Sequence, residues 1–322
     1  MPSRLAELTA SPMLVQYAQG IAQTGVQPIA DFFAPTVPVP TMRGRYKKYS
    51  QKNRFRIPDT KRPMGGKAVV LEWTMEDATY DCTPNSIDVP VDMIEQREAE
   101  SAGANFIMES AQMAADVATL SHEQRVIQLA KDNVTATAGI GAWLDANGNP
   151  VSGDPVGEID SLIETVTKAA PGGSGSSVGL LFGSTAWRYF KNHTAVRSKF
   201  VVGRATGQVG VAIPTIEMAA GLFLFEPEIM ISRMVYDTAR EGQTRSLDFL
   251  MTTDIFVFVR RSAPTRLDPT FMKTFRLANQ WMVPGTYIRE DQRAEVVKFD
   301  WSADVEITNS DACARITVGA AP

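Results

Sequence analysis

The chain has 322 residues, 44% hydrophobic and 21% charged, a composition typical of a globular protein and long enough for two compact units. No apolar run approaches the roughly 20 residues of a membrane helix, so we expect no membrane partner. The two cysteines, Cys82 and Cys313, exclude a disulfide scaffold. Reduced thiols are favoured, although a single bridge remains possible.

Charge is distributed unevenly along the chain. The formal net charge is only −4, but ten Lys or Arg residues and one acid, Asp59, lie between Thr41 and Lys67. This block carries +9, so the remaining residues sum to −13. Nine acids and one base, Arg97, follow between Glu72 and Glu100. A basic segment is therefore followed directly by an acidic one.

The basic block has the pattern of a long hairpin. Before it, Pro35, Pro38 and Pro40 predict an extended, polyproline-like segment over Ala34–Pro40. Arg43–Ile57 partly alternates charged with apolar or aromatic residues, which favours an exposed strand. Turn residues follow, and Ala68–Trp73 is the expected return strand. Such a polar ribbon is marginal alone in water and needs a surface to lie on.

The strongest helical signal runs from Val91 to about Val134. Apolar residues recur at steps of three and four and predict one buried face, made of Ala99, Ala102, Phe106, Met113, Val117 and Leu120. Ser121 and Gln124 form a capping-box pattern, so we expect the helix to restart at His122. Together these make a long helix broken once.

Residues 155–260 alternate helix and strand, which predicts an α/β unit with a central sheet. Expected helices cover Ile159–Val166, a segment beginning at Ser184 and Pro214–Ala220. Expected strands are Val178–Phe182, Leu222–Phe225, Ile229–Tyr236 and Leu247–Val259. After Pro264 we expect short strands that pair with segments preceding the α/β unit, at Trp281–Tyr287, Glu295–Phe299, Val305–Thr308 and Ala314–Val318. The α/β unit is then an insertion in a second, elongated domain.

Motifs that suggest chemistry are weak. Gly175–Gly179 matches Gly-x-Ser-x-Gly, but a loop precedes the serine where a nucleophile elbow needs a strand. Gly203–Gln208 lacks the Gly-Lys-Ser/Thr ending of a phosphate-binding loop. His122 and His193 are too far apart for zinc spacing, and the acids of 72–100 favour a solvated face. We therefore predict no catalytic residues, no cofactor and no metal.

Two interpretations of the basic block remain open. Tyr46, Tyr49 and Phe55 stand among the cations as in a nucleic-acid surface. Alternatively, the block lies on the acidic surface of another copy of the chain, since the acidic segment has the right charge. The second interpretation is favoured, with these candidate contacts between subunits: Arg43, Arg45, Lys47, Lys48, Lys52, Arg54, Arg56, Glu95, Glu98 and Glu100.

The order of these parts resembles the Hong Kong 97-type capsid fold of tailed bacteriophages. Short sequence segments also resemble those of this family: LLFGSTAWRYFKNHTAVRSKF (Leu180–Phe200), MVYDTAREGQTRS (Met234–Ser246) and DPTFMKTF (Asp268–Phe275). VDMIEQREAE and LSHEQRVIQLAKDNVTA resemble the acidic approach and the spine helix. The resemblance covers about residues 40–320. It implies an α+β fold with an N-terminal arm (1–40), an E-loop (41–75), a P-domain with the spine helix (76–154 and 261–322) and an inserted α/β A-domain (155–260).

The resemblance also implies a function. Copies are expected to assemble as hexamers and pentamers of an icosahedral shell around double-stranded DNA, without catalysis. Expected partners are the chain itself, a portal, separate scaffolding or decoration proteins, and DNA bound non-specifically. The expected location is the virion capsid, assembled in the bacterial host cytoplasm. Two alternatives stay open: an encapsulin-type shell that packages enzymes, and a soluble nucleic-acid-binding protein.

Overall fold

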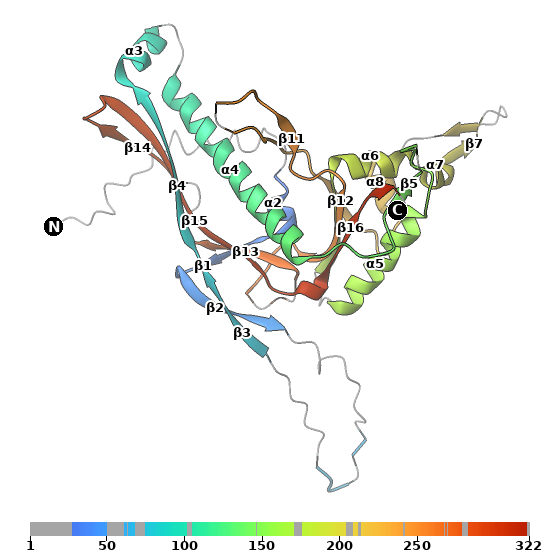
Figure 1. Cartoon of the computed structure of the whole chain (residues 1–322). Helices are drawn as coiled ribbons and strands as arrows, with labels where there is room; N and C mark the ends of the chain where they lie inside the picture. Colours follow the sequence, from blue (N-terminus) through green and yellow to red (C-terminus); the bar gives the residue numbers. More distant parts are fainter. Residues whose placement is uncertain are drawn as a thin grey trace.

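The computed structural model describes residues 28–49, 61–62, 64–67, 75–101, 105–145, 147–170, 176–203, 209–211, 214–240, 242–266, 268, 270–278 and 283–320. Two sheets and one long helix organise these residues (Figure 1). No helix among them is both long and apolar enough to span a membrane.

The larger sheet is built on one long strand, β15 (Ala294–Ile307). β4 (Thr83–Asp92) pairs with it along one edge. β14 (Val283–Arg289) and β13 (Met272–Leu277) lie end to end along the other edge. Asp300 of β15 pairs with β14 and Ala303 with β13, while both residues also pair with β4 on the opposite side. All three pairings are antiparallel, and the remaining strand is β1 (Thr36–Val39), parallel to β13 at the outside.

Helix α4 (Phe106–Asn133) lies along this sheet. Its buried alanines contact alternate residues of β15, pairing Ala111 with Val297, Ala114 and Ala115 with Phe299, and Ala118 with Trp301 and Ala303. One helical turn advances about 5.4 Å and two strand residues about 6.6 Å, so the contacts stay nearly in step. The small side chains allow the helix to approach the strand closely.

The second sheet has the order β16 (Cys313–Thr317), β12 (Asp254–Arg261), β6 (Ser176–Phe182) and β9 (Glu228–Ile231). β12 is antiparallel to both neighbours, and β9 is parallel to β6. Residues 254–259 of β12 are all buried, as expected for a continuous apolar strand in a core. The surrounding helices are α5 (Pro155–Ala169), α6 (Ser184–Asn192), α7 (Thr194–Lys199) and α8 (Ile216–Ala220).

The remaining elements are short, apart from the hairpin β2 (Arg43–Tyr49) and β3 (Met75–Asp81) that projects from the end of the larger sheet (Figure 1). The short helices are α2 (Ala30–Phe33), α3 (Met93–Ser101) and the 3-10 turn η1 (Ser310–Ala312). The short strand pairs are β5 (Ala142–Leu144) with β17 (Gly319–Ala320), β7 (Val201–Gly203) with β8 (Val209–Val211), and β10 (Val235–Asp237) with β11 (Leu247–Phe249).

The proline-rich segment differs from its prediction. Ala34–Pro40 contains the hydrogen-bonded strand β1, and so is more than a polyproline-like segment. β1 lies at the edge of the sheet, where a proline can be accommodated because one side of the strand needs no donor.

The hairpin is confirmed, but its return strand is different. β2 pairs with residues 75–81, which carry part of the acidic segment, whereas the predicted return strand Ala68–Trp73 lies outside the described residues. β3 continues almost directly into β4 across Cys82 (Figure 1). The prediction failed here because acidic residues usually disfavour strands, and cross-strand pairing with basic residues offsets that preference.

The helical region 91–134 also differs in its break. Val91 and Asp92 end strand β4, α3 ends at Ser101, and α4 begins at Phe106 after an N-cap in which the Asn105 side chain accepts from the Met108 amide (3.2 Å). No restart occurs at His122, since α4 continues through it. A capping-box pattern inside a well-packed helix is overridden by tertiary contacts.

Smaller differences concern the strands of the second half. Residues 222–225 form a turn, Leu247–Val259 is split into β11 and β12, and the two strands predicted at 295–299 and 305–308 are the single strand β15. β15 pairs with β4, which precedes the α/β region, as predicted. β13 was not predicted as a strand and pairs with β1, whereas β14 pairs with β15 and β16 pairs with β12 inside the α/β region. The domain boundaries given above stay a prediction.

Candidate interaction surfaces

The polar motifs do not assemble into a chemical site. Within the described ranges no group of three His, Cys, Asp or Glu residues could hold a metal. Ser176 and Ser177 lie inside strand β6, so neither follows a strand as a nucleophile elbow requires. His193 caps α7, its Nδ1 accepting from the Ala195 amide (3.2 Å), and its Nε2 lies 2.8 Å from the Ser152 carbonyl oxygen. His122 is buried, and desolvation lowers its pKa to about 4.

The predicted apolar face of the long helix is only partly buried. Ala99 is 6% exposed and Leu120 is partly buried against the core, whereas Phe106, Met113 and Val117 are 37%, 54% and 47% exposed; Ala102 lies outside the described residues. The residues of α4 buried against β15 are alanines instead. For the three exposed residues the prediction was wrong, because it assigned the larger side chains to the core. The three residues follow steps of seven and four and form an outer stripe on α4.

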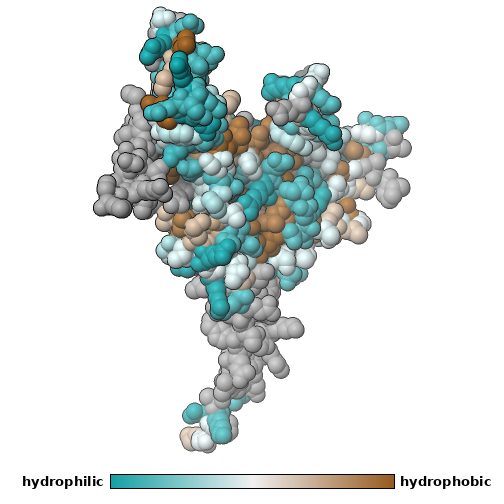
Figure 2. Space-filling view, turned by 60° about the vertical axis from the view of Figure 1, so that its left-hand side comes forward, coloured by the Kyte–Doolittle hydropathy of each residue, from teal (hydrophilic) through white to brown (hydrophobic). Residues whose placement is uncertain are grey.

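A second apolar feature is the ribbon β10–β11. Val235 and Phe249 are direct cross-strand partners, and Leu247 begins the same strand, β11, two residues before Phe249. Val235, Phe249 and Leu247 are 40%, 42% and 53% exposed. Figure 2 shows apolar surface between the upper end of the molecule, where α3 and the start of α4 lie, and its middle. Exposed apolar residues that recur on neighbouring elements are typical of an interaction surface.

The candidate charged residues lie at two ends of the molecule. Arg43 and Arg45 are exposed on β2, and Glu95 and Glu98 are exposed on α3, at the opposite end of the molecule (Figure 1). The structure therefore does not bring the two sets together within one chain. Glu100 lies in α3 and Lys47 and Lys48 in β2, with side chains that are not described; Lys52, Arg54 and Arg56 lie outside the described residues.

Part of the basic block has its acidic partner in its own hairpin. The Arg43 Nε donates to the Asp81 carboxylate (3.0 Å), a pairing that raises the pKa of the arginine. In the strand register Lys47 faces Asp77 and Lys48 faces Glu76. The sequence prediction missed this intrachain pairing, because it treated 72–100 as a single surface.

Aromatic packing fixes the base of the hairpin to the larger sheet. The Tyr80 ring stacks on Phe275 at 4.8 Å and the Tyr46 ring lies 5.1 Å from it, with Tyr46 only 2% exposed. The Tyr46 hydroxyl donates to Glu306 (3.3 Å), and its pKa is raised, first by burial and then by that carboxylate. Tyr46 is therefore unavailable to stack on a nucleic-acid base, which weakens the nucleic-acid interpretation of this block.

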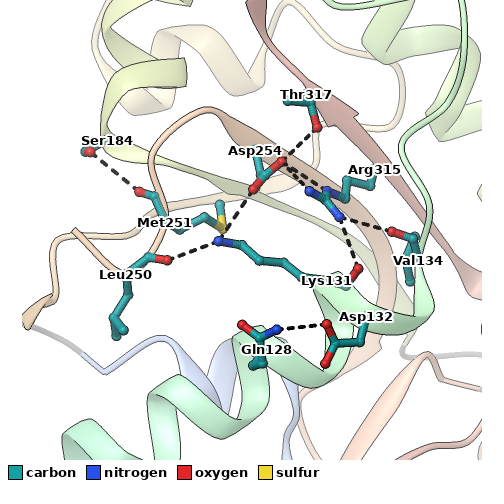
Figure 3. A network of polar contacts seen from close by, with 10 residues as sticks. All are labelled: Gln128, Lys131, Asp132, Val134, Ser184, Leu250, Met251, Asp254, Arg315 and Thr317. Atoms are coloured by element: carbon teal, nitrogen blue, oxygen red, sulfur yellow. Dashed lines mark hydrogen bonds and ion pairs between the residues drawn. The ribbon is translucent and has the colours of Figure 1, made fainter. Parts of the chain in front are cut away.

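A buried ion network fixes the other end of α4 to the second sheet (Figure 3). Asp254 on β12 accepts from Arg315 Nε (3.0 Å) and from the Thr317 hydroxyl (2.8 Å), and lies 3.6 Å from the Lys131 ammonium. Arg315 also donates to the carbonyls of Lys131 (3.1 Å) and Val134 (3.4 Å) at the end of the helix. The long helix α4 and the second sheet are thus joined by charge-assisted hydrogen bonds, which are stronger than hydrogen bonds between neutral groups.

Comparisons with known proteins identify the fold. No family model and no curated protein matches the sequence. Among solved structures, a phage-related protein from Bordetella bronchiseptica has a TM-score of 0.65 and 18% identity, over 96% of this chain and 97% of its own. The capsid of a native GTA particle has a TM-score of 0.57 and 10% identity, over 92% and 91% of the two chains. An encapsulin complex from Synechococcus elongatus has a TM-score of 0.51 and 11% identity, over 92% and 88%.

These matches extend over nearly the whole of each chain, so the long helix, the two sheets and the hairpin together make the α+β fold of capsid-type shell proteins. The prediction of a Hong Kong 97-type fold is confirmed at this level. The identities of 18% and below support the fold alone.

Proposed function

We propose that this chain is the major capsid protein of a tailed bacteriophage, which assembles as hexamers and pentamers into an icosahedral shell around double-stranded DNA. The fold supports a shell protein, because the matched proteins include a particle capsid and an encapsulin complex. The proposed role is structural and involves no catalysis. Portal, scaffolding or decoration proteins would be further partners in the host cytoplasm, and the virion capsid the final location.

The observation that carries the proposal is the position of the hairpin and α3. The basic hairpin projects from one end of the larger sheet and the acidic α3 lies at the other, with β3, β4 and α4 between them (Figure 1). A rigid element with opposite charges at its two ends can pair with copies of itself and cannot close on itself. Head-to-tail contacts of this kind generate rings when the rotation closes.

The hairpin supplies the reach for such a contact. Its base is fixed by Tyr46 and Tyr80 on Phe275, and the Asp81 amide donates to Asp304 (2.8 Å). Among the basic residues that the structure describes beyond the base, Arg62 and Lys67 are exposed. We propose that basic residues of the hairpin contact the α3 region of a neighbouring copy, and that many such weak contacts add up over the shell.

The alternative is an encapsulin-type shell that holds enzymes. It is supported by the match to the encapsulin complex, whose fold is the same. The contents of purified particles distinguish the two: nuclease-protected double-stranded DNA supports the capsid, and co-purifying enzyme with no protected DNA supports the encapsulin-type shell. The soluble nucleic-acid-binding alternative is disfavoured by the burial of Tyr46.

Assembly is tested with the full chain by size-exclusion chromatography and electron microscopy. We expect capsomers or closed particles. The triple variant Lys52→Glu, Arg54→Glu, Arg56→Glu should elute as a folded small species, because reversing the charges turns attraction into repulsion. The matched control Lys52→Arg, Arg54→Lys, Arg56→Lys keeps every charge and should assemble. Intact assembly of the Glu variant together with lost DNA binding would show that the basic residues contact DNA instead.

A further inference from the structure

A buried glutamate holds the N-terminal part of the described chain against the long helix. Glu123 lies in the middle of α4 and is fully buried. Its Oε1 accepts a hydrogen bond from the backbone amide of Ala30, at the start of α2, over 2.7 Å. The two residues are 93 positions apart in the chain, so this bond joins distant segments.

The segment that this bond holds, residues 29–39, is called here the strap. It comprises α2 and β1 and has several further attachments. Phe33 packs against Phe258 at 4.7 Å and Phe256 at 5.1 Å, the Thr274 hydroxyl donates to the Ala34 carbonyl over 3.0 Å, and β1 pairs with β13. The Arg260 guanidinium lies 4.4 Å from the Phe32 ring, and Asp31 interacts with the charge of Arg276. Among these attachments Glu123 contributes the fully buried acid of α4.

The surroundings of Glu123 suit a neutral carboxyl better than an ionised one. Its second oxygen, Oε2, is buried without a well-aligned hydrogen bond, although the nearby Ile29 amide favours the ionised form. The nearest charge on the strap is Asp31, which has the same sign as an ionised glutamate. A buried carboxylate with an unpaired oxygen and an acidic neighbour is costly, whereas a neutral carboxyl still accepts the Ala30 hydrogen bond through its carbonyl oxygen.

We propose that Glu123 is a pH-sensitive latch: the neutral carboxyl holds the strap on α4, and ionisation loosens it, so the strap opens more often as the solution becomes alkaline. Burial raises the pKa of Glu123 from 4.5 to about 7, opposed by the amides of Ala30 and Ile29 and reinforced by Asp31. When the strap opens, the carboxyl reaches water and its pKa returns toward the ordinary value. Between pH 4.5 and about 7, opening therefore releases a proton. The stability of the docked strap is highest below this range and is lost as the pH rises through 7.

The pH dependence caused by Glu123 must be distinguished from that of other charged groups near it. Asp31 on α2 has a pKa raised by desolvation, against the opposing charge of Arg276 on β13. His122 on α4 has its pKa lowered to about 4 and so stays neutral over the range in question. Arg125, two residues after Glu123 on α4, lies 3.5 Å from Asp304 on β15, and its charge contributes to lowering the pKa of His122.

Amide hydrogen exchange of the full chain tests the latch. The opening constant of the strap is the observed exchange rate of the amides in 30–39 divided by their intrinsic rate at each pH. Between pH 5 and pH 8 it should rise by about tenfold to a hundredfold, with a limiting slope of about tenfold per pH unit. Glu123→Gln keeps the acceptor oxygen and removes the ionisation, so its profile should lose most of this rise. Asp31 on the strap and the buried Lys273 on β13, whose pKa burial lowers to about 8, are the same in both chains.

The control is Glu109→Gln, an exposed glutamate in the first turn of the same helix, which should behave as wild type. Asp31→Asn should move the midpoint of the rise to lower pH, because it removes a charge that raises the pKa of Glu123. A flat wild-type profile, a Glu123→Gln profile that keeps the slope, or an unmoved midpoint in Asp31→Asn each overturns the proposal. The wild-type and Asp31→Asn profiles decide it even if Glu123→Gln does not fold.

Discussion

Asp254 is the buried acid on which the joint between α4 and the second sheet depends. It is 5% exposed, and Arg315, Thr317 and Lys131 surround its carboxylate. A buried pair adds little net stability compared with an apolar pair, but removal of one partner leaves a buried charge uncompensated. The network is therefore more important for fixing the arrangement of the two parts than for the total free energy of folding.

Asp254→Ala should lower the free energy of unfolding by about 3–5 kcal/mol, because Arg315 and Lys131 then lose their counter-charge. Denaturant unfolding followed by circular dichroism measures the change. Glu164→Ala is the matched control, since it removes an exposed partner of Lys168 four residues away, and should cost less than about 0.5 kcal/mol. Equal losses in the two variants would contradict a structural role for the network.

The two cysteines should be inert in the folded chain. Both are free and buried in the structure. Burial raises the pKa of Cys82 to about 11 and that of Cys313 well above its ordinary value. Only the thiolate reacts with Ellman's reagent, so at pH 8 we expect fewer than one fast-reacting thiol per chain, and two after denaturation. Rapid labelling of both thiols in the native chain would contradict their burial.

At the scale of elements, α4 has two faces with different tasks. Ala114 is buried against Phe299, and Met113 next to it is 54% exposed. The alanine face holds the helix on the sheet. The outer stripe with Phe106 and Val117 is free, within the described part of the chain, to contact another molecule.

Met113→Glu with Val117→Glu should therefore leave the monomer folded, with unfolding free energy changed by less than about 1 kcal/mol, and should reduce assembly. Ala114→Glu, one residue away, places a charge in the core and should destabilise the chain severely. Thermal unfolding and sedimentation velocity separate the two effects. If the Met113/Val117 variant assembles normally, the stripe is not part of an interface.

Sequence reasoning succeeded where one physical signal dominated. The apolar period predicted α5, and the short apolar run Val178–Phe182 predicted β6, because both lie in the core and their patterns follow burial directly. The sequence did not predict β3 and β4, whose sequences are acidic or contain proline, because their strand conformation depends on partners far along the chain. It also misjudged part of the apolar face of α4, since amphipathic spacing alone does not tell a core face from an exposed apolar face.

The candidate contact residues were predicted from charge alone, and the structure adds the positions of the ones it describes. Arg43 is paired with Asp81 in its own hairpin, which could be found only once the strand register was known. Glu95 and Glu98 are exposed, as a contact requires.

At the scale of the whole molecule, opposite charges at the two ends predict a salt-dependent assembly. The contacts that we propose lie on exposed residues, and the screening length shortens from about 10 Å at 0.1 M salt to about 3 Å at 1 M. The rate of assembly, followed by light scattering, should fall steeply with added NaCl, and the Lys/Arg-swapped control should follow the same curve. A rate that rises with salt would indicate that the apolar surfaces dominate association.

The pairing of strands far apart in sequence has a consequence for how the chain is made. β1 pairs with β13, β4 with β15, and β12 with β16, so both sheets join early and late segments. The larger sheet is complete only once Ile307 has left the ribosome, and the second sheet only once Thr317 has. The nascent chain must carry unpaired strand edges and the apolar residues of α4 through most of its synthesis, which slows folding and exposes it to aggregation. High-level expression should therefore depend on lowered temperature or on chaperones that shield these edges until the last strand arrives.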